Sequence, residues 1–437
     1  MNQQTDKTEI AADERHSLIL PTENSSKDKR FQHWFKFEKN EILLLLSYFI
    51  FGLAFANYEP YAPVWLNQFF KVESYLVIGL VVVIPNIMVL IGTTILGILA
   101  DKFGAKKFVL VGLGAFVLMF LLLIFTTGPV YFLVIVLFGH FLGSAQTSNF
   151  YAFATKSINK PKEVILAKIT MTVSLAFVIL SPIVGLIYDS FSNSMTIQLI
   201  IATVACLISL VFVFFIIEKK ETPEVVSKTV EDIAKTEIAQ KRTPLTIVPW
   251  LFTGITFLVF AFQTAGGFWA YTSLYFLDTL SVKGLYYSIF LIAKTALAIP
   301  LAFLLGRLKS VKGIGLTTVL FTGWIAIDYL LMTLFPMNWI MILLIYSIPM
   351  YPLYNVSFYS LVTVFSSFEK RATAYGIFNT LGTAGYAIGI IILGVLADYS
   401  SLGILVMLRT SLIFAGIAFI ISTLLFILRF RKEKITS

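Results

Sequence analysis

Charged residues are scarce in this sequence. Asp, Glu, Lys and Arg make up 13% of the 437 residues, whereas hydrophobic residues make up 58%. Soluble domains carry about 25% charged residues, and a soluble fold has too little interior to bury so much apolar surface. The composition excludes a chain of ordinary soluble domains and predicts an integral membrane protein whose helices face lipid. The basic residues lie in short segments between apolar runs, which is not the pattern of a nucleic-acid partner.

Cysteine and histidine are also nearly absent. The single cysteine, Cys206, excludes an intrachain disulfide and any CxxC metal or redox site. The three histidines, His16, His33 and His140, form no HExxH motif, and there is no GxxxxGK[ST] loop or strand-anchored GxGxxG. We therefore expect no cofactor, no metal and no enzymatic activity. Any solute movement would draw on a gradient, because ATP binding and hydrolysis are excluded.

Long apolar runs dominate what is present. They predict an all-α polytopic membrane protein with twelve spans of about 20 residues or more. The windows are residues 41–66, 74–100, 106–127, 129–154, 164–188, 195–217, 246–275, 284–308, 314–335, 338–362, 373–397 and 402–428. The first 40 residues contain no cleavable signal peptide, so the first span is expected to target the chain.

The basic residues predict the orientation of the spans. Of the 33 Lys and Arg residues, 29 lie in the two tails or near the gaps after even-numbered spans. Positively charged loops stay in the cytoplasm, so both termini are predicted to be cytoplasmic. The opposite gaps are short and carry no Asn-x-Ser/Thr acceptor, which disfavours a receptor or an adhesion protein.

The spans fall into two halves that resemble each other. A polar linker, residues 218–245, separates a six-helix half at 41–217 from another at 246–428, and residues 1–40 and 429–437 form the tails. The segment Gly185-Leu-Ile-Tyr-Asp189 is matched 209 residues later by Gly394-Val-Leu-Ala-Asp398, and the ends of the second and eighth spans match at the same offset. The matches indicate a duplication with the halves in parallel orientation, in which a substrate sits between the halves.

The loop between the second and third spans carries a family resemblance. Its pattern Gly97-x-Leu-Ala-Asp101-Lys102-x-Gly104-x-Lys106-Lys107 resembles the signature loop of the major facilitator superfamily, within its general drug and solute transporters. The resemblance implies a monomeric secondary transporter that works by alternating access.

The resemblance also implies a gate in this loop. In the family, an acid at the position of Asp101 contacts the start of the eleventh helix, here next to Arg371, and holds the outward-open state. Gly97 and Gly104 permit close helix approach and a tight turn, while an anion is favourable at a helix N-terminus. Lys102, Lys106 and Lys107 would supply counter-charges. The alternative is that the lysines only orient the loop.

Two other family motifs match less well. The fifth-helix motif of antiporters is reduced to Ser181-Pro-Ile-Val-Gly185, and the arginine of the fourth-helix motif is replaced by Gly139, with His140 next to it. Membership of the proton-driven drug exporters therefore stays open.

Four ionisable residues lie deep enough within the spans to suggest a function: Glu59, His140, Lys294 and Asp328. A charge in mid-membrane costs about 2.5–3.5 kcal/mol, so each requires an explanation. Glu59 could carry a proton, because a carboxylate shielded from water holds its proton more readily, or it could lie among headgroups. His140 could exchange protons or only bond a neighbouring helix. Lys294 and Asp328 should lie at similar depth and could form a structural ion pair or contact substrate.

The resemblance places the first, fourth, seventh and tenth helices around a central cavity. The residues there that combine rings with polar groups are Asn57, Ser144, Thr147, Tyr151, Gln263, Trp269, Tyr346, Tyr351, Tyr354 and Asn355. Tyrosines and amides suit a neutral or amphiphilic organic solute. The alternative is that the aromatic rings only fill space between helices.

The sequence thus predicts a proton-coupled transporter of a small organic solute, with export favoured over import. The alternatives are a facilitative or proton-symport importer of sugars or organic acids, and a lipid scramblase or other non-transporting membrane protein. We expect the plasma membrane, or an endolysosomal membrane if the source is eukaryotic, because residues 14–19 fit an acidic dileucine sorting pattern.

Overall fold

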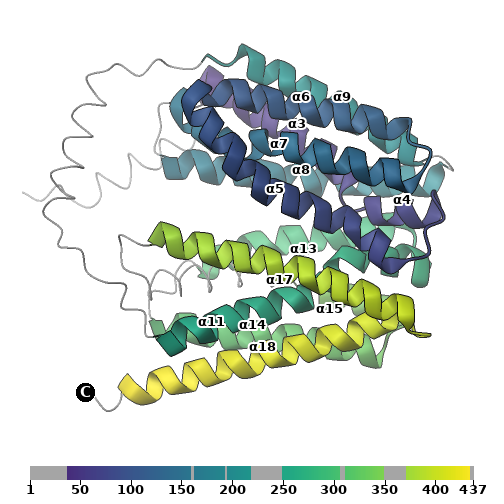
Figure 1. Ribbon diagram of the computed structural model, residues 1–437, viewed down its shortest axis with the longest axis vertical. Coiled ribbons are helices and arrows are strands. Elements are labelled where there is room, and N and C mark those ends of the chain that lie inside the picture. The colour runs from purple at the N-terminus through teal and green to yellow at the C-terminus, as the bar shows by residue number, and fades with distance from the viewer. Residues whose placement is uncertain are drawn as a thin grey trace, which may run out of the picture.

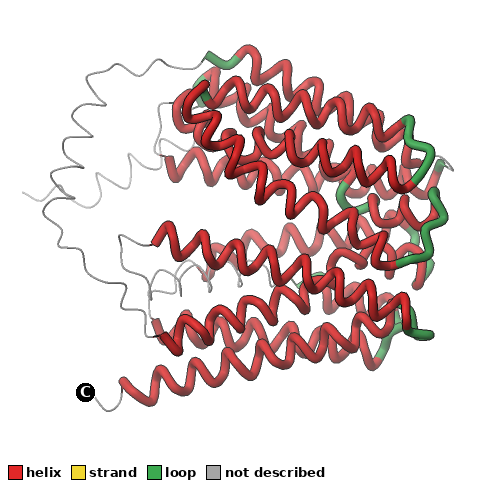
Figure 2. The backbone as a smooth tube through the Cα atoms, viewed as in Figure 1, coloured by secondary structure: helices red, strands yellow, loops and turns green. Residues whose placement is uncertain are grey.

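The computed structural model describes residues 37–158, 162–191, 194–217, 249–305, 311–348 and 371–433. Within these ranges the chain is helical, with short connections and no strand (Figure 2). Nine helices of the described part are long and apolar enough to cross a membrane. An all-α polytopic membrane protein is therefore confirmed. The predicted linker and the sorting pattern lie outside the described residues.

The helices form two bundles, one above the other in Figure 1. The N-terminal bundle contains α3 (Lys39–Tyr58), α4 (Ala62–Gln68), α5 (Tyr75–Phe103), α6 (Ala105–Ile124), α7 (Pro129–Ser157), α8 (Lys162–Ser190) and α9 (Ser194–Phe215). The C-terminal bundle contains α11 (Pro249–Gly266), η1 (Gly267–Tyr271), α12 (Thr272–Leu274), η2 (Tyr275–Thr279), α13 (Gly284–Leu305), α14 (Val311–Leu334), α15 (Trp339–Tyr346), α17 (Arg371–Tyr399) and α18 (Ile404–Glu433).

Local sequence signals set where these helices begin and end. The Ser74 hydroxyl caps the start of α5 by accepting a hydrogen bond from the Val77 amide at 3.3 Å. Gly104 ends α5 with a φ of 103°, a backbone conformation that side chains with a Cβ rarely adopt. Pro129 is the first residue of α7, where its missing N–H costs nothing.

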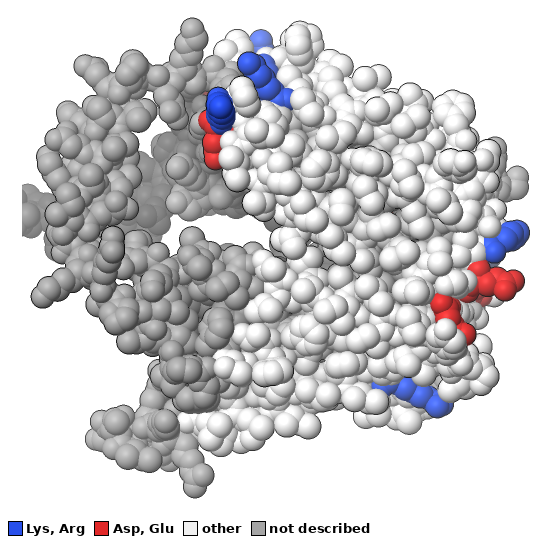
Figure 3. Space-filling model, in the orientation of Figure 1, with Lys and Arg blue, Asp and Glu red and all other residues white. Residues whose placement is uncertain are grey.

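The molecule has two ends that differ in their connections. At the end we call the terminal end, the described chain begins at Phe37 and finishes at Glu433. At the opposite, short-loop end lie connections such as residues 69–74, 280–283 and 400–403. Figure 3 shows charged side chains toward these two ends and an uncharged belt between them on the face in view. Such a belt is what a lipid bilayer requires.

The two bundles meet at the short-loop end and diverge toward the terminal end (Figure 1). Helix α5 shows this change along its length, because no residue from Tyr75 to Val89 is exposed, whereas exposed side chains recur from Leu90 to Phe103. The space-filling surface is hollowed between the bundles on the terminal side (Figure 3). The structure is therefore open toward the terminal end.

Two predicted spans are interrupted. The predicted helix 41–66 is split into α3 and α4 at Glu59, Pro60 and Tyr61, because proline cannot continue the helical hydrogen bonds. The predicted helix 246–275 changes after Gly266 into the 3₁₀ segment η1. Hydropathy windows missed both breaks, since the residues at each break remain mostly apolar. Of the predicted helix 338–362, α15 covers the first part, and the rest lies outside the described residues.

Candidate transport site between the two bundles

Glu59 lies at the break between α3 and α4, toward the short-loop end. Its side chain is exposed, whereas its neighbours Asn57, Tyr58 and Tyr61 are buried. The carboxylate is within electrostatic range of Tyr287 on α13 and of Tyr386 on α17, which both belong to the C-terminal bundle. Glu59 therefore points into the region between the bundles and not toward lipid headgroups alone.

The two residues that precede Glu59 carry buried polar atoms. The Asn57 side chain donates a hydrogen bond to the Leu53 carbonyl at 2.8 Å. Among the described residues, neither Asn57 Oδ1 nor the Tyr58 hydroxyl has a hydrogen-bond partner. Leaving such a group unsatisfied costs about 1–3 kcal/mol. Neither atom is accessible in this conformation, so a partner could reach it only after a change in the packing around α3.

The break in the C-terminal bundle lies at the equivalent position. Trp269 in η1 follows Pro60 by 209 residues, the offset of the internal repeat. Its side chain is partly exposed, while the flanking Phe268 and Ala270 are buried. Gln263, one turn before the break, is also partly exposed, and its Cβ lies where Gly385 of α17 approaches α11. Both predicted cavity residues of this helix thus lie at or beside an irregular segment.

His140 lies in the interior of the N-terminal bundle. It is 5% exposed, and the rings of Phe55, Tyr58 and Phe116 surround it with centroids 5.7–6.3 Å away. Nδ1 is 2.9 Å from the Val136 carbonyl, one turn earlier in α7. Within this conformation His140 contacts helices and not the region between the bundles. Its role in proton exchange stays a prediction.

The other predicted cavity residues of α7 do not form one exposed face. Ser144 is buried against Gly92 of α5 and donates a hydrogen bond to the Phe141 carbonyl. Thr147 is half-buried and donates to Gln146 Oε1 at 3.3 Å. Tyr151 is exposed and stands edge-on to Tyr48. Of these three residues Tyr151 alone is exposed, because Ser144 and Thr147 bond within their own helix.

Asp328 on α14 is buried, with 3% of its surface exposed. The side chain of its predicted partner, Lys294, lies outside the described residues, as does that of Tyr346. Tyr351, Tyr354 and Asn355 lie outside them entirely. The predicted ion pair and the predicted wall of the tenth helix therefore stay predictions.

The predicted gating loop is at the terminal end, where the bundles are apart. Asp101, Lys102 and Lys107 are exposed, and a Cβ at Gly97 would meet no atom within 4 Å. The Lys106 ammonium instead donates to the carbonyls of Phe214 and Ile216 at the end of α9, at 3.0 and 2.6 Å. The Arg371 side chain lies outside the described residues. The loop has the accessibility expected when the terminal end is open.

Two aspartates at the short-loop end were not assigned a role from the sequence. Asp189, at the end of α8, accepts hydrogen bonds from the amides of Gly284 and Leu285 at 2.7 and 3.0 Å. Asp398, at the end of α17, accepts from the amides of Tyr75 and Leu76 at 2.5 and 3.2 Å and from the Ser74 hydroxyl at 2.7 Å. Each aspartate caps a helix of the other bundle. The repeated Gly-x-x-x-Asp ends were the available signal.

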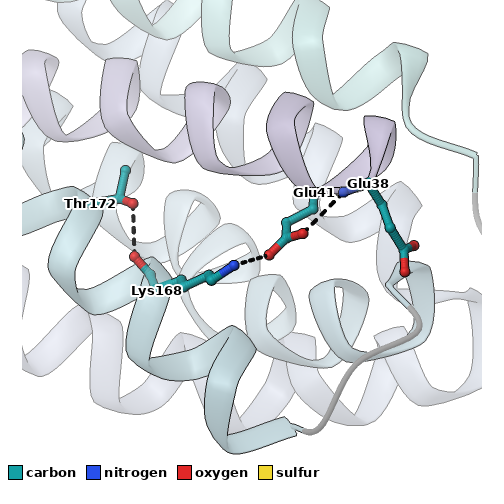
Figure 4. Close-up of polar contacts among 4 residues, drawn as sticks. All are labelled: Glu38, Glu41, Lys168 and Thr172. Atoms are coloured by element: carbon teal, nitrogen blue, oxygen red, sulfur yellow. Dashed lines mark hydrogen bonds and ion pairs between the residues drawn. The ribbon is translucent and has the colours of Figure 1, made fainter. Parts of the chain in front are cut away.

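A buried ion pair was also missed. Lys168 on α8 donates to Glu41 on α3 at 2.7 Å, and the two side chains are 7% and 1% exposed (Figure 4). The other Glu41 oxygen accepts from the Glu38 amide at 3.2 Å, and the Lys168 ammonium lies 4.1 Å from the centroid of the Phe37 ring. The pair ties the terminal ends of two helices of the N-terminal bundle. The sequence pattern places Lys168 only among the 29 basic residues that predict orientation.

Two bundles of membrane-crossing helices, joined at one end and repeated in sequence, define a polytopic transporter fold. Residues 44–390 match the model of the Major Facilitator Superfamily. The chain belongs to this family of secondary transporters, as the signature loop predicted. No curated protein matches the sequence.

Solved structures with the same fold are transporters of several solutes. A mutant of the nucleoside transporter NupG is 17% identical, with a TM-score of 0.67 over 89% of this chain and 99% of that one. The D-xylose-proton symporter is 12% identical, with a TM-score of 0.70 over 87% and 96%. The POT family transporter PepTSo is 10% identical, with a TM-score of 0.68 over 92% and 99%. At these identities the likeness establishes the fold alone.

Proposed function

We propose that the protein moves a small organic solute across a membrane by alternating access between its two bundles, coupled to protons. The observation that carries this proposal is the exposed carboxylate of Glu59 at a helix break, in range of hydroxyl groups from the opposite bundle. Ionisable residues at such depth in a membrane protein are usually functional. Discontinuous helices commonly form the binding sites of secondary transporters.

Coupling follows from the position of Glu59. While the terminal end is open, the carboxylate is accessible to water and exchanges its proton. When the bundles close around the site, the charged form loses that water, so a protonated carboxylate or one neutralised by solute is favoured. The protonation state of Glu59 then biases which conformations are reached. The proposed cycle needs no cofactor.

The chemistry around Glu59 favours a neutral or amphiphilic organic solute. Tyr287 and Tyr386 of the opposite bundle bring rings and hydroxyl groups within electrostatic range of the carboxylate. We propose that the terminal end faces the cytoplasm, in line with the distribution of basic residues, that export is the direction, and that the protein is a monomer of the plasma membrane. An importer of sugars or organic acids is the alternative, in which Lys294 would pair with an anionic solute.

The test is solute flux in proteoliposomes. A thermal-shift screen of the purified protein first identifies a solute. We expect an imposed pH gradient to drive uphill accumulation, and Glu59→Gln to abolish that accumulation while exchange of solute across the membrane persists. Glu73→Gln, at an exposed acid of the short-loop end, is the matched control and should behave like the parent.

Two results would contradict the proposal. Flux that ignores the pH gradient and is unchanged in Glu59→Gln and Asp328→Asn would exclude proton coupling through these residues. Phospholipid exchange between bilayer leaflets, with no solute bound or moved, would favour a scramblase instead.

A further inference from the structure

Asp189 and Asp398 make equivalent contacts in the two halves of the chain. The two aspartates are 209 residues apart, and so are the helix starts that they cap, Tyr75-Leu76 and Gly284-Leu285. In each case the two carboxylate oxygens accept from successive amides, so that each amide has its own acceptor. The contact thus has equivalent partners in both halves, and the aspartates, their glycines and the second capped residue, Leu76 or Leu285, are also identical in type.

The physical strength of this contact comes from the helix start. The first amides of α5 and α13 have no partner within their own helix, and the helix dipole adds partial positive charge there. A carboxylate satisfies two such amides with charge-assisted hydrogen bonds, which are stronger than neutral ones. When the aspartate moves away, the carboxylate and the two amides lose these hydrogen bonds and are exposed to water.

Glycines allow the helices to come this close. A Cβ at Gly185 would lie 2.5 Å from the carbonyl oxygen of Gly284, and a Cβ at Gly394 would lie 2.8 Å from Cα of Leu76. Both distances are shorter than any real Cβ contact. Each aspartate thus follows, one turn later, a glycine that lets its helix touch the helix that the aspartate caps.

We propose that Asp189 and Asp398 are paired latches that hold the short-loop end closed and thereby favour the state open at the terminal end. Each latch joins one bundle to the other, so rocking the bundles apart at the short-loop end breaks both. Their contributions to the closed state add in free energy, which means that their effects on the ratio of closed to open molecules multiply. The inference rests on the proposed alternating access.

The experiment measures opening directly. In a Cys206→Ser background, Ser288→Cys places a thiol on α13 at a residue that is fully buried and bonded to Tyr61 of the other bundle at 3.1 Å. The protein is placed in lipid nanodiscs and treated with a water-soluble maleimide. If opening is fast relative to labelling, the labelling rate is proportional to the fraction open at the short-loop end.

We expect Asp189→Ala and Asp398→Ala each to raise the labelling rate roughly 2- to 30-fold, the range of helix-capping effects. The double variant should show the product of the two increases. Asp189→Asn and Asp398→Asn should give smaller increases, because an amide offers one neutral oxygen to two amides. Asp278→Ala removes an exposed acid at the same end and should leave the rate unchanged.

The distant latch makes the test decisive. Asp398 caps α5, whereas the reporter at position 288 is on α13, so only a movement of whole bundles connects Asp398→Ala to the thiol. An increase confined to Asp189→Ala would show local loosening and overturn the proposal, as would rates equal to that of Asp278→Ala. The asparagine variants and a melting curve for each protein separate opening from misfolding.

Labelling needs no solute, so the latches and the proposed function can fail separately. Faster labelling in a protein that moves no solute would retain the latches and refute the proposed function. Solute flux with unchanged labelling in the aspartate variants would retain the proposed function and refute the latches.

Discussion

The ion pair between Glu41 and Lys168 shows how a single residue can be costly to remove without being a large source of stability. Both side chains are almost fully buried at the terminal end of the N-terminal bundle. Removing one partner of such a pair leaves the other charge buried alone, which costs about 3–5 kcal/mol, whereas replacing both can be nearly neutral.

We therefore expect Lys168→Met to lower the melting temperature more than the double variant Glu41→Gln/Lys168→Met does. Lys39→Met is the matched control, because Lys39 is an exposed lysine at the start of the same helix as Glu41. The measurement is thermal unfolding of each purified protein. A double variant that melts below Lys168→Met would contradict this expectation and show that Glu41 stabilises the protein through contacts other than Lys168, such as that with the Glu38 amide.

Residue-level prediction reached the ionisable residues but not their surroundings. Hydropathy windows show that Glu59 and His140 lie within spans, because each interrupts an apolar run. They cannot show that Glu59 faces the opposite bundle while aromatic rings enclose His140, since this depends on how each helix is rotated against its neighbours. Lys168 was misjudged for the same reason, as its partner is 127 residues away.

At the scale of helices, glycines decide which pairs can pack closely. A Cβ at Gly112 on α6 would lie 2.6 Å from Cβ of Gln146 on α7 and closer still to the Gln146 amide nitrogen. Two residues later, a Cβ at Gly114 would find only a methyl group of Leu210 at 3.8 Å. The two glycines of one helix thus have opposite environments.

This contrast gives a matched pair of variants. Gly112→Ala must push α6 away from the backbone of α7, and we expect it to destabilise the protein by about 1–3 kcal/mol. Gly114→Ala should be neutral or should stabilise the protein by up to about 1 kcal/mol, because alanine has a higher helix propensity than glycine. Melting curves of the two proteins test this, and equal melting temperatures would contradict it.

The helices themselves were largely predictable, and their irregularities were not. Long apolar windows located α5, α6, α7 and α9 closely, because a membrane-crossing segment needs about 20 apolar residues. The breaks at Pro60 and after Gly266 did carry proline and glycine signals. Those residues only permit a break, since Pro85 and Pro182 lie inside helices that continue past them.

At the scale of the whole molecule, orientation in the membrane can be tested by labelling cysteines introduced at the two ends. Cys206 is the single cysteine of the sequence and is fully buried, so the parent protein should not react with an impermeant thiol reagent. Glu73 is exposed at the short-loop end and Lys107 at the terminal end. A cysteine at either position reports one side of the membrane.

We expect reagent outside intact cells to label Glu73→Cys but not Lys107→Cys, and the reverse in inside-out vesicles. The physical reason is that basic loops are retained in the cytoplasm during insertion. The opposite pattern would place the termini outside the cell. Labelling of both positions from one side would contradict the arrangement of the ends described above.

Matching segments predict a duplication, whereas no sequence pattern predicts which end of the molecule is closed. Asp101 and Asp398 are both acids near helix ends. The family resemblance assigned a gating role to Asp101 and no role to Asp398. In the present conformation Asp398 is engaged and Asp101 is exposed, because the bundles meet at one end only.

The reciprocal caps also bear on the symmetry of the contact between the bundles. Asp189 of the first half binds residues 284 and 285 of the second half, and Asp398 of the second half binds residues 75 and 76 of the first. Each residue in one contact is 209 positions from its equivalent in the other, so the two halves exchange the same contact. In a symmetric homodimer, a patch on one subunit binds its counterpart in this way, with residue i contacting j and j contacting i. The contact between the bundles therefore has the reciprocal form of an isologous two-fold interface, although both sides belong to one polypeptide.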